Sequence, residues 1–277
     1  MRRDAKWLCR GLLPARVRGD VGFRTKRHSG LDCHEYCAWS ARDPDLARLK
    51  CGRSSFGIRS TATLLVRGTA KAFCAGGDLK GMGISGGPVL TADQRLSRLL
   101  EGQRQLTGAL VNLRKPVIAA IPGPAVGAGL SLALACDIRI GSLSSFVTTG
   151  YARVGLSGDY GISSLLTRAV GSGRARELMF TAERIDSKKC LELGIYNRIV
   201  ADDELLDYSM SFAEELARGP RKAFALMKDN LNDALVLNFE NSLDSEASRL
   251  IEAMASSDHK EAVRAFAEKR EPVFGGN

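Results

Sequence analysis

Two glycine-rich turns are the first candidates for a catalytic role in this chain of 277 residues. Gly76 and Gly77 follow one apolar run, and residues 123–129, which include three glycines, follow another. The first N–H groups of a helix have no intrahelical acceptor, and glycine allows a ligand oxygen to approach the backbone closely. Two such turns can direct two N–H groups at one oxygen, which is the arrangement of an oxyanion hole.

Nucleotide binding is the main alternative for glycine-rich turns. The dinucleotide fingerprint G-x-G-x-x-G is absent, because Gly127-Ala128-Gly129 is followed by Leu130-Ser131-Leu132. A phosphate-binding loop that ends in G-K-[ST] is absent as well. Either turn alone has an equally good structural explanation, but the two together favour a functional role.

Serine hydrolase chemistry and a metal site are both disfavoured. Ser131 and Ser157 lie outside any G-x-S-x-G frame, and a nucleophile of this kind needs a nearby base. The histidines are His28, His34 and His259. The pair Cys33 and Cys37 has no matching second pair at zinc-ligand spacing, so we predict free thiols and no metal.

The elements around the two turns predict a parallel α/β core. Short apolar runs at 63–66, 116–121 and 137–140 predict buried strands, and residues 130–136 predict an apolar helix between the last two. This alternation of strand, glycine turn, helix and strand is typical of βαβ units.

An amphipathic helix is predicted over about 92–113, after a glycine- and proline-rich break at 81–88 that predicts a mobile loop. Its apolar positions recur at helical spacing, and they are Leu96, Leu99, Leu100, Leu106, Leu110 and Leu113. Beyond residue 162 almost the whole chain is predicted to be helical, with one strand at 196–200. The predicted helices are 162–169, 173–180, 186–193, 202–218, 221–233, 238–256 and 258–269.

The positive charge is concentrated in the first 60 residues, which show no sustained helical or strand period. They hold 14 Lys/Arg against 6 Asp/Glu, a net +8 of the total +9, so the rest of the chain is nearly neutral. This distribution argues against a nucleic-acid-binding surface over the whole protein.

No apolar run is long enough for a membrane span, and the seven cysteines predict reduced thiols in the cytoplasm. A mitochondrial presequence is the alternative for the arginines of 1–30.

Four separated motifs resemble the enoyl-CoA hydratase/isomerase (crotonase) family, in the order that the family has them. They lie at 71–79, 115–138, 154–171 and 258–274, so the resemblance covers about 61–277. It implies a crotonase-like α/β spiral of ββα and βαβ units with a helical C-terminal region that mediates trimerisation. The expected division is 1–60, a basic segment of unassigned fold; 61–200, the core with the acyl-CoA site; and 201–277, the helical region.

The resemblance also implies binding of an acyl-CoA thioester, with no cofactor other than the coenzyme A of the substrate. The backbone N–H groups of Gly77 and Ala128 should stabilise the enolate oxygen. Substrate or coenzyme A contacts are expected at Ala75, Gly76, Asp78, Leu79, Lys80, Ser131, Tyr151, Lys269 and Phe274. The family is usually a trimer or a dimer of trimers, and its reactions belong to fatty acid metabolism. The alternatives are a helix cap for Asp78 and a solvated charge for Lys269.

The acid/base residues depart from the hydratase pattern of the family, which uses two glutamates. The corresponding positions are Ser131 and Tyr151, whose hydroxyls are poor general bases at neutral pH. Asp159 instead resembles the aspartate with which family isomerases carry a proton. The alternative for Asp159 is a cap on the helix that starts near Ile162.

We therefore expect an isomerase that interconverts 3-enoyl-CoA and 2-enoyl-CoA, with Asp159 as the proton carrier. One alternative is a hydratase in which Asp159 or Tyr151 handles water. An alternative of another class is a catalytically weak coenzyme-A-binding or RNA-binding protein that uses its basic first 60 residues to contact phosphate.

Overall fold

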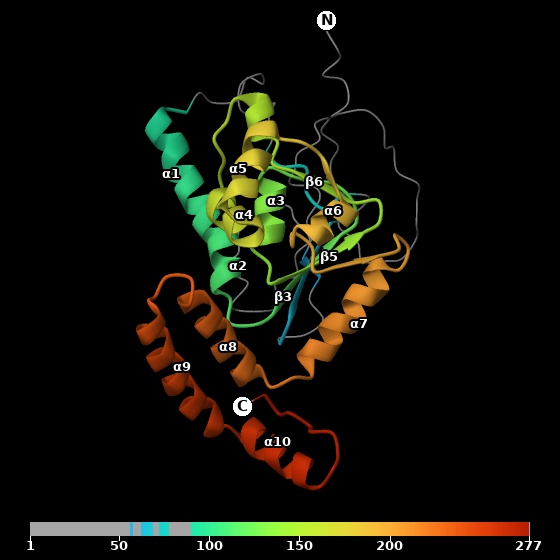
Figure 1. Cartoon of the computed structure of the whole chain (residues 1–277), viewed down its shortest axis with the longest axis vertical. Helices are drawn as coiled ribbons and strands as arrows, with labels where there is room; N and C mark the ends of the chain where they lie inside the picture. Colours follow the sequence, from blue (N-terminus) through green and yellow to red (C-terminus); the bar gives the residue numbers. More distant parts are fainter. Residues whose placement is uncertain (1–55, 58–61, 69–71, 78–89, 277) are drawn as a thin grey trace, which may run out of the picture. The chain divides into compact units, whose positions relative to one another are not determined.

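The computed structural model describes residues 56–57, 62–68, 72–77 and 90–276 (Figure 1). The predicted loop at 81–88, the pair Cys33 and Cys37, and nearly all of the basic segment lie outside these residues. Among the described residues, no helix is both long and apolar enough to cross a bilayer.

The main sheet has five strands in the order β1-β2-β3-β5-β8. These are β1 (Phe56–Gly57), β2 (Leu64–Arg67), β3 (Val117–Ile121), β5 (Ile138–Ser142) and β8 (Arg198–Val200). β1 is antiparallel to β2, and the other neighbours are parallel. The predicted strands are therefore confirmed, and the last strand of the sheet comes from far along the chain.

Alternate residues of the central strands pack into two separate hydrophobic cores. In β3, Val117, Ala119 and Ile121 face the larger core with α3 (Ala128–Leu134) and α4 (Ile162–Val170). Ile118 and Ala120 face the smaller core beneath α7 (Leu205–Ala217), which lies on the other side of the sheet in Figure 1. Burial on both faces explains why these strands are continuous apolar runs.

A second, three-stranded sheet was not predicted from the sequence. It has the order β4-β6-β7, formed by β4 (Ala125–Val126), β6 (Phe146–Thr148) and β7 (Ile185–Asp186). Strands of two or three residues are too short to show a period of alternation, which is why they give no signal.

The helix expected at 92–113 is present but interrupted. It consists of α1 (Ala92–Gln103), a π-helical turn at Arg104–Gly108 and α2 (Ala109–Asn112). Leu106 and Leu110 are buried, whereas Leu96 and Leu99 of α1 are exposed, so only the second half presents its apolar face to the core.

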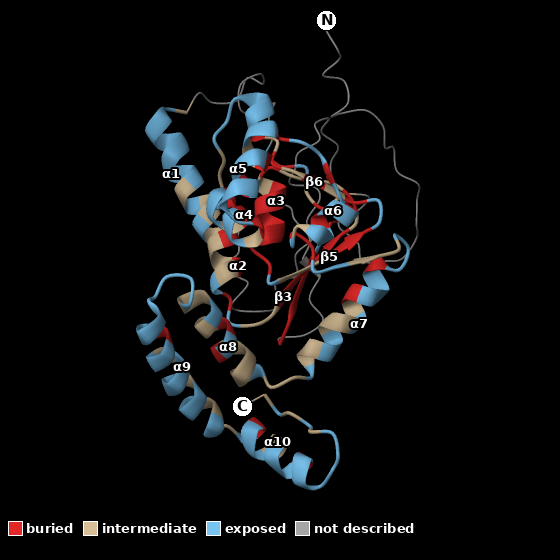
Figure 2. Ribbon diagram, in the orientation of Figure 1, coloured by how far each residue is buried: buried red, intermediate tan, exposed pale blue. Residues whose placement is uncertain are grey.

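The remaining helices match the predicted ones within a few residues at each end. They are α5 (Ser172–Thr181), α6 (Ser187–Glu192), α8 (Arg221–Asp233), α9 (Phe239–Met254) and α10 (Ser257–Ala267). A 3₁₀ turn, Tyr151–Val154, was not predicted. In Figure 2, β3 and most of α3 are buried, whereas most of α8, α9 and α10 is exposed or intermediate.

Candidate active site

The two glycine-rich turns lie side by side, as an oxyanion hole requires. Cys74 and Ala125 form an isolated parallel bridge between them. The N–H of Val126 donates to the Cys74 carbonyl over 3.0 Å, and the N–H of Phe73 donates to the Pro124 carbonyl over 3.0 Å. Turns that are about 50 residues apart in the sequence are thus held in fixed register by backbone hydrogen bonds.

Glycine is required where the two turns cross. A Cβ on Gly129 would lie 2.3 Å from the carbonyl oxygen of Cys74, which is far inside van der Waals contact. Gly76 has φ +92°, and a Cβ there would lie 2.7 Å from the Val126 oxygen and 3.9 Å from the nitrogen of Ala128. The first turn therefore passes directly beside the start of α3.

The predicted oxyanion donors lie on these joined turns. Gly127, with φ +54°, precedes α3, and its carbonyl accepts the N–H groups of Leu130 and Ser131 over 2.9 and 3.1 Å. The N–H of Ala128 belongs to the first helical residue and has no acceptor within the helix. Gly77 is exposed and directly follows the buried Gly76.

Asp159 directs its carboxylate at a tyrosine and does not cap a helix. The hydroxyl of Tyr151 donates to Oδ1 of Asp159 over 2.7 Å. The N-cap of α4 is Gly161 in the left-handed conformation, without a side-chain hydrogen bond. Only the main-chain carbonyl of Asp159 serves the helix start, since it accepts the N–H of Ile162 over 3.1 Å. The capping alternative is therefore wrong.

The two positions at which glutamates were expected converge on Asp159. Ser131 is fully buried in α3, and its hydroxyl donates to the main-chain carbonyl of Asp159 over 3.2 Å. Tyr151 is 6% exposed, and a Cβ built on Gly127 or on Gly158 would lie within 3.9 Å of its ring. The structure thus brings Ser131, Tyr151 and Asp159 together beside the turn that begins α3.

Tyr151 acts as a hydrogen-bond donor over the whole neutral pH range. Burial raises the pKa of its phenol well above the ordinary value. The negative charge of Asp159 and its hydrogen bond raise the pKa further, while Ser131 opposes the shift. A phenol of this kind does not serve as a general base near neutral pH.

One contact of this loop was not predicted from the sequence. The N–H of Tyr160 donates to Oε1 of Gln103 over 3.2 Å, and Tyr160 itself has φ +51°. Gln103 is the last residue of α1, directly before the π-helical turn. Because a π-helical turn interrupts the helical period only locally, no spacing rule marks this contact in advance.

The other predicted substrate contacts are scattered or lie outside the described residues. Ala75 is exposed on the first turn. Lys269 follows α10 with φ +54°, and Phe274 is half-buried in the C-terminal tail. Within one chain, both residues therefore lie on different elements from those that carry Ser131, Tyr151 and Asp159. Asp78, Leu79 and Lys80 are outside the described residues.

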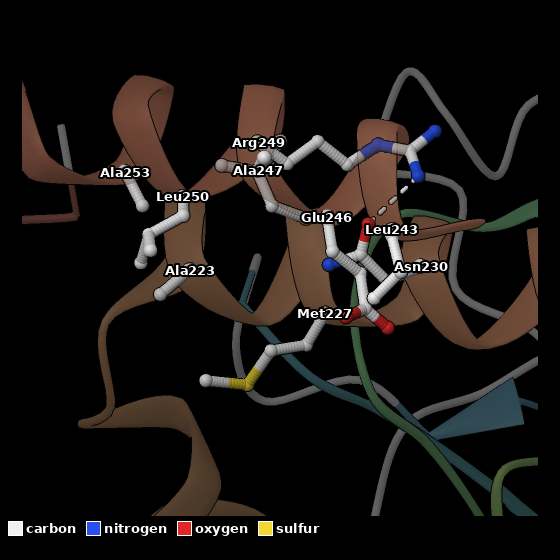
Figure 3. A pocket seen from close by; sticks show the side chains of 10 residues that line it. Ala223, Met227, Asn230, Leu243, Glu246, Ala247, Arg249, Leu250 and Ala253 are labelled. Carbon is white, nitrogen blue, oxygen red and sulfur yellow. Dashed lines mark hydrogen bonds between the residues drawn. The ribbon is translucent and has the colours of Figure 1, made fainter. Parts of the chain in front are cut away.

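The groove between two C-terminal helices does not include the Asp159 cluster. It has a volume of about 420 Å³ and lies between α8 and α9, where Met227 and Leu250 line it (Figure 3). The hydrogen bond from Arg249 to Asn230 crosses between these helices. A smaller cavity of about 320 Å³ is closer, since Ser157 and Met179 line it. Within the described part of the chain, no cluster of three or more metal-ligand side chains occurs.

Comparisons with known proteins identify the family of this chain. The family model for enoyl-CoA hydratase/isomerase matches residues 59–277. A probable enoyl-CoA hydratase of Bacillus subtilis is 34% identical over 221 residues, which is 79% of this chain and 83% of the relative. The 1,2-epoxyphenylacetyl-CoA isomerase of Escherichia coli is 34% identical over 214 residues, covering 77% and 80%.

Solved structures show the same relationship. A putative enoyl-CoA hydratase from Streptomyces coelicolor superposes with a TM-score of 0.74 at 30% identity, covering 84% of this chain and 82% of that one. A match to the family model over more than three quarters of the chain, with relatives above 30% identity, establishes its membership. This chain belongs to the enoyl-CoA hydratase/isomerase family, and its fold is the crotonase fold.

Proposed function

We propose that this chain is an enoyl-CoA isomerase, in which Asp159 removes a proton from one carbon of the acyl chain and returns it to another. The observation that carries this proposal is the convergence of Ser131 and Tyr151 on Asp159. The Tyr151 hydroxyl donates to the carboxylate of Asp159 and the Ser131 hydroxyl to its main-chain carbonyl, so the positions that supply two carboxylates in a family hydratase here both contact one aspartate. One carboxylate is sufficient for proton transfer, whereas family hydration uses two.

The reaction conserves all atoms. The C–H bond of the thioester substrate breaks, its proton moves to the Asp159 carboxylate, and the electron pair becomes the enolate. The N–H groups of Gly77 and Ala128 would stabilise the enolate oxygen, and the register of the two turns supports this role. The proton then returns to the carbon at the other end of the allylic system, and the double bond has moved.

The test is mass spectrometry of 2-enoyl-CoA and 3-enoyl-CoA after incubation with the protein in D₂O. We expect a moved double bond, incorporated deuterium and no added water. Asp159→Asn should abolish the conversion, while Asp203→Asn, a matched change in an exposed turn, should leave it intact. Full turnover by the Asp159→Asn protein would refute the proposal.

A hydratase is the second candidate, because several relatives are named as probable enoyl-CoA hydratases. Tyr151 remains protonated and cannot act as a base near neutral pH, so Asp159 would have to activate the water alone. Addition of one water to 2-enoyl-CoA in the same experiment would support this candidate and exclude the pure isomerase.

The assembly that we propose is a homotrimer or a dimer of trimers in the cytoplasm. Support comes from α9 and α10, where Phe239 and Phe266 are 77% and 86% exposed. Exposed apolar patches of this kind mark interaction surfaces. Light scattering should give the mass of three or six chains of 29.8 kDa, and Phe266→Asp should lower it. A monomeric wild-type protein would contradict this assembly.

A further inference from the structure

Tyr151 holds one specific oxygen of the Asp159 carboxylate. Its hydroxyl lies 2.7 Å from Oδ1, which is the distance of a strong hydrogen bond between a neutral donor and a charged acceptor. Tyr151 is 6% exposed and Asp159 is half-buried, so water competes weakly for this contact. The described contacts of the carboxylate therefore engage Oδ1 and leave Oδ2 as the oxygen available to a substrate.

The tyrosine ring lies beside two glycines. A Cβ on Gly127 would lie 3.8 Å from Cζ of the ring, and a Cβ on Gly158 would lie 3.9 Å from Cε2. Both glycines have positive φ, +54° and +113°, so the backbone at both positions is suited to glycine. The ring thus lies against the turn before α3 and against the residue that precedes Asp159.

The backbone on both sides of Tyr151 is anchored as well. The hydroxyl of Thr149 donates to the Leu178 carbonyl over 2.8 Å, and Nε of Arg153 donates to the Ala182 carbonyl over 2.9 Å. These contacts attach the 3₁₀ turn to α5 and to the residue that follows it. A side chain with both flanks fixed and its ring packed cannot swing away from the carboxylate without disturbing the turn.

The main chain of Asp159 is fixed independently of its carboxylate. Its carbonyl accepts hydrogen bonds from the Ser131 hydroxyl over 3.2 Å and from the Ile162 N–H over 3.1 Å. The backbone position of Asp159 therefore has supports besides Tyr151, although the phenol oxygen also interacts with the Asp159 main chain and with the Ser131 hydroxyl. What the tyrosine hydroxyl adds is the orientation of the carboxylate plane.

We propose that Tyr151 is the positioning residue for Asp159: its hydroxyl fixes Oδ1, so that Oδ2 alone takes the proton from one carbon and returns it to the other. This inference rests on the proposed isomerase function. Tyr151 neither gains nor loses a proton in the cycle. The only bonds that change are the two C–H bonds, the transient O–H bond at Oδ2 and the double bonds of the enolate.

The direct test is Tyr151→Phe, which removes the hydroxyl and keeps the ring between the two glycines. A misoriented catalytic group costs roughly 10- to 100-fold in rate, so kcat should fall by this factor while KM stays nearly unchanged. A rotating carboxylate should also lose its proton to solvent more often. Deuterium incorporated per turnover in D₂O should therefore rise, and a purely structural role would not cause this change.

Tyr196→Phe is the matched control, because it also removes the hydroxyl of a buried tyrosine. The ring of Tyr196 packs against Gly141 of β5. It should leave kcat and the deuterium content unchanged. Unchanged kcat and deuterium content in a folded Tyr151→Phe protein would overturn the positioning role. If Asp159→Asn were inactive in the same assay, the isomerase proposal would still stand, so the two failures are distinguishable.

A second variant keeps the test valid if Tyr151→Phe does not fold. Site-specific 3-fluorotyrosine at position 151 keeps the ring and the hydroxyl and makes the hydroxyl a stronger donor. We expect a changed kcat at constant KM. If the 3-fluorotyrosine protein and the wild-type protein had identical kcat, the positioning role would be refuted. An unchanged kcat in the Tyr151→Phe protein would have the same meaning.

Discussion

Nζ of Lys228 in α8 lies 2.7 Å from Oδ2 of Asp137, the residue that precedes β5. The same ammonium donates to the carbonyls of Leu110 and Lys115, each over 3.3 Å. Asp137 in turn accepts the N–H of Val117, the first residue of β3. One lysine side chain thus connects the C-terminal helices to the end of α2 and to two strands of the main sheet.

Lys228→Ala should destabilise the protein by about 1–3 kcal/mol, because it leaves the Asp137 carboxylate and two main-chain carbonyls without their donor. Lys222→Ala on the same helix is the control. Lys222 forms a more exposed ion pair with Glu252 at 3.4 Å, and such pairs contribute about 0–1 kcal/mol. Urea unfolding of the two variants measures both values. If the two variants lost the same free energy of unfolding, the Asp137 contact would contribute no more than an exposed ion pair.

Gly129→Ala should impair both stability and activity. The new Cβ would lie 2.3 Å from the Cys74 carbonyl, so the two turns that carry the proposed oxyanion donors would have to separate. Overpacking of this kind costs about 1–3 kcal/mol. Thermal unfolding and the isomerase assay would measure the two effects.

Gly173→Ala in α5 is the matched control for this change, because a Cβ there meets nothing within 4 Å. It should be neutral or slightly stabilising. Wild-type activity and melting temperature in the Gly129→Ala protein would show that the turns can separate without cost.

The C-terminal tail should detach from α10 in acid. Hydrogen bonds from Arg270, from the N–H of Val273 and from Arg264 lower the pKa of Glu261 to about 2. The folded-state pKa is thus below the unfolded value. These contacts therefore stabilise the tail fully above about pH 4.5, and this stability is lost as the pH falls toward about 2.

Melting temperatures across this pH range would test the prediction with Glu261→Gln. The variant should melt below the wild-type protein at neutral pH, and the two curves should converge in acid. Glu192→Gln, which removes an exposed ion pair on α6, should show a much smaller difference. A constant gap between Glu261→Gln and wild type at every pH would contradict the assignment.

Two cysteines of the core should resist alkylation. Burial raises the pKa of the Cys136 and Cys190 thiols to about 12, so both remain protonated at about pH 8, and only the thiolate reacts. Iodoacetamide should label the peptides that contain them in urea but not in the native protein. Rapid labelling of either peptide in the native protein would show that its thiol is accessible.

Much of the fold could be predicted because its elements are long or uniformly apolar. The strands of the parallel sheet are buried on both faces, and α8 was predicted with both of its ends correct. The leucine spacing of α1 was less reliable. Leu96 and Leu99 lie at core-facing positions of the pattern but are exposed, because periodicity gives the face of a helix and not what covers it.

The sequence predicted which turns and residues form the site, but not how their side chains are oriented toward one another. The motifs gave the two turns and Asp159, but the contact between Tyr151 and Asp159 depends on a chain path with positive φ at Gly155, Gly158 and Tyr160. In the sequence such positions indicate only that a turn occurs. The direction in which the turn points a side chain follows from dihedral angles that the residue types permit but do not specify.

The strand order of the main sheet has a consequence for how the chain is synthesised. β8 pairs with β5, although residues 143–197 separate them. Tyr151 and Asp159 both lie in that interval, so they leave the ribosome before the strand that completes the sheet. Pairing of distant parallel strands is slow. The carboxylate loop is therefore translated while the main sheet still lacks β8.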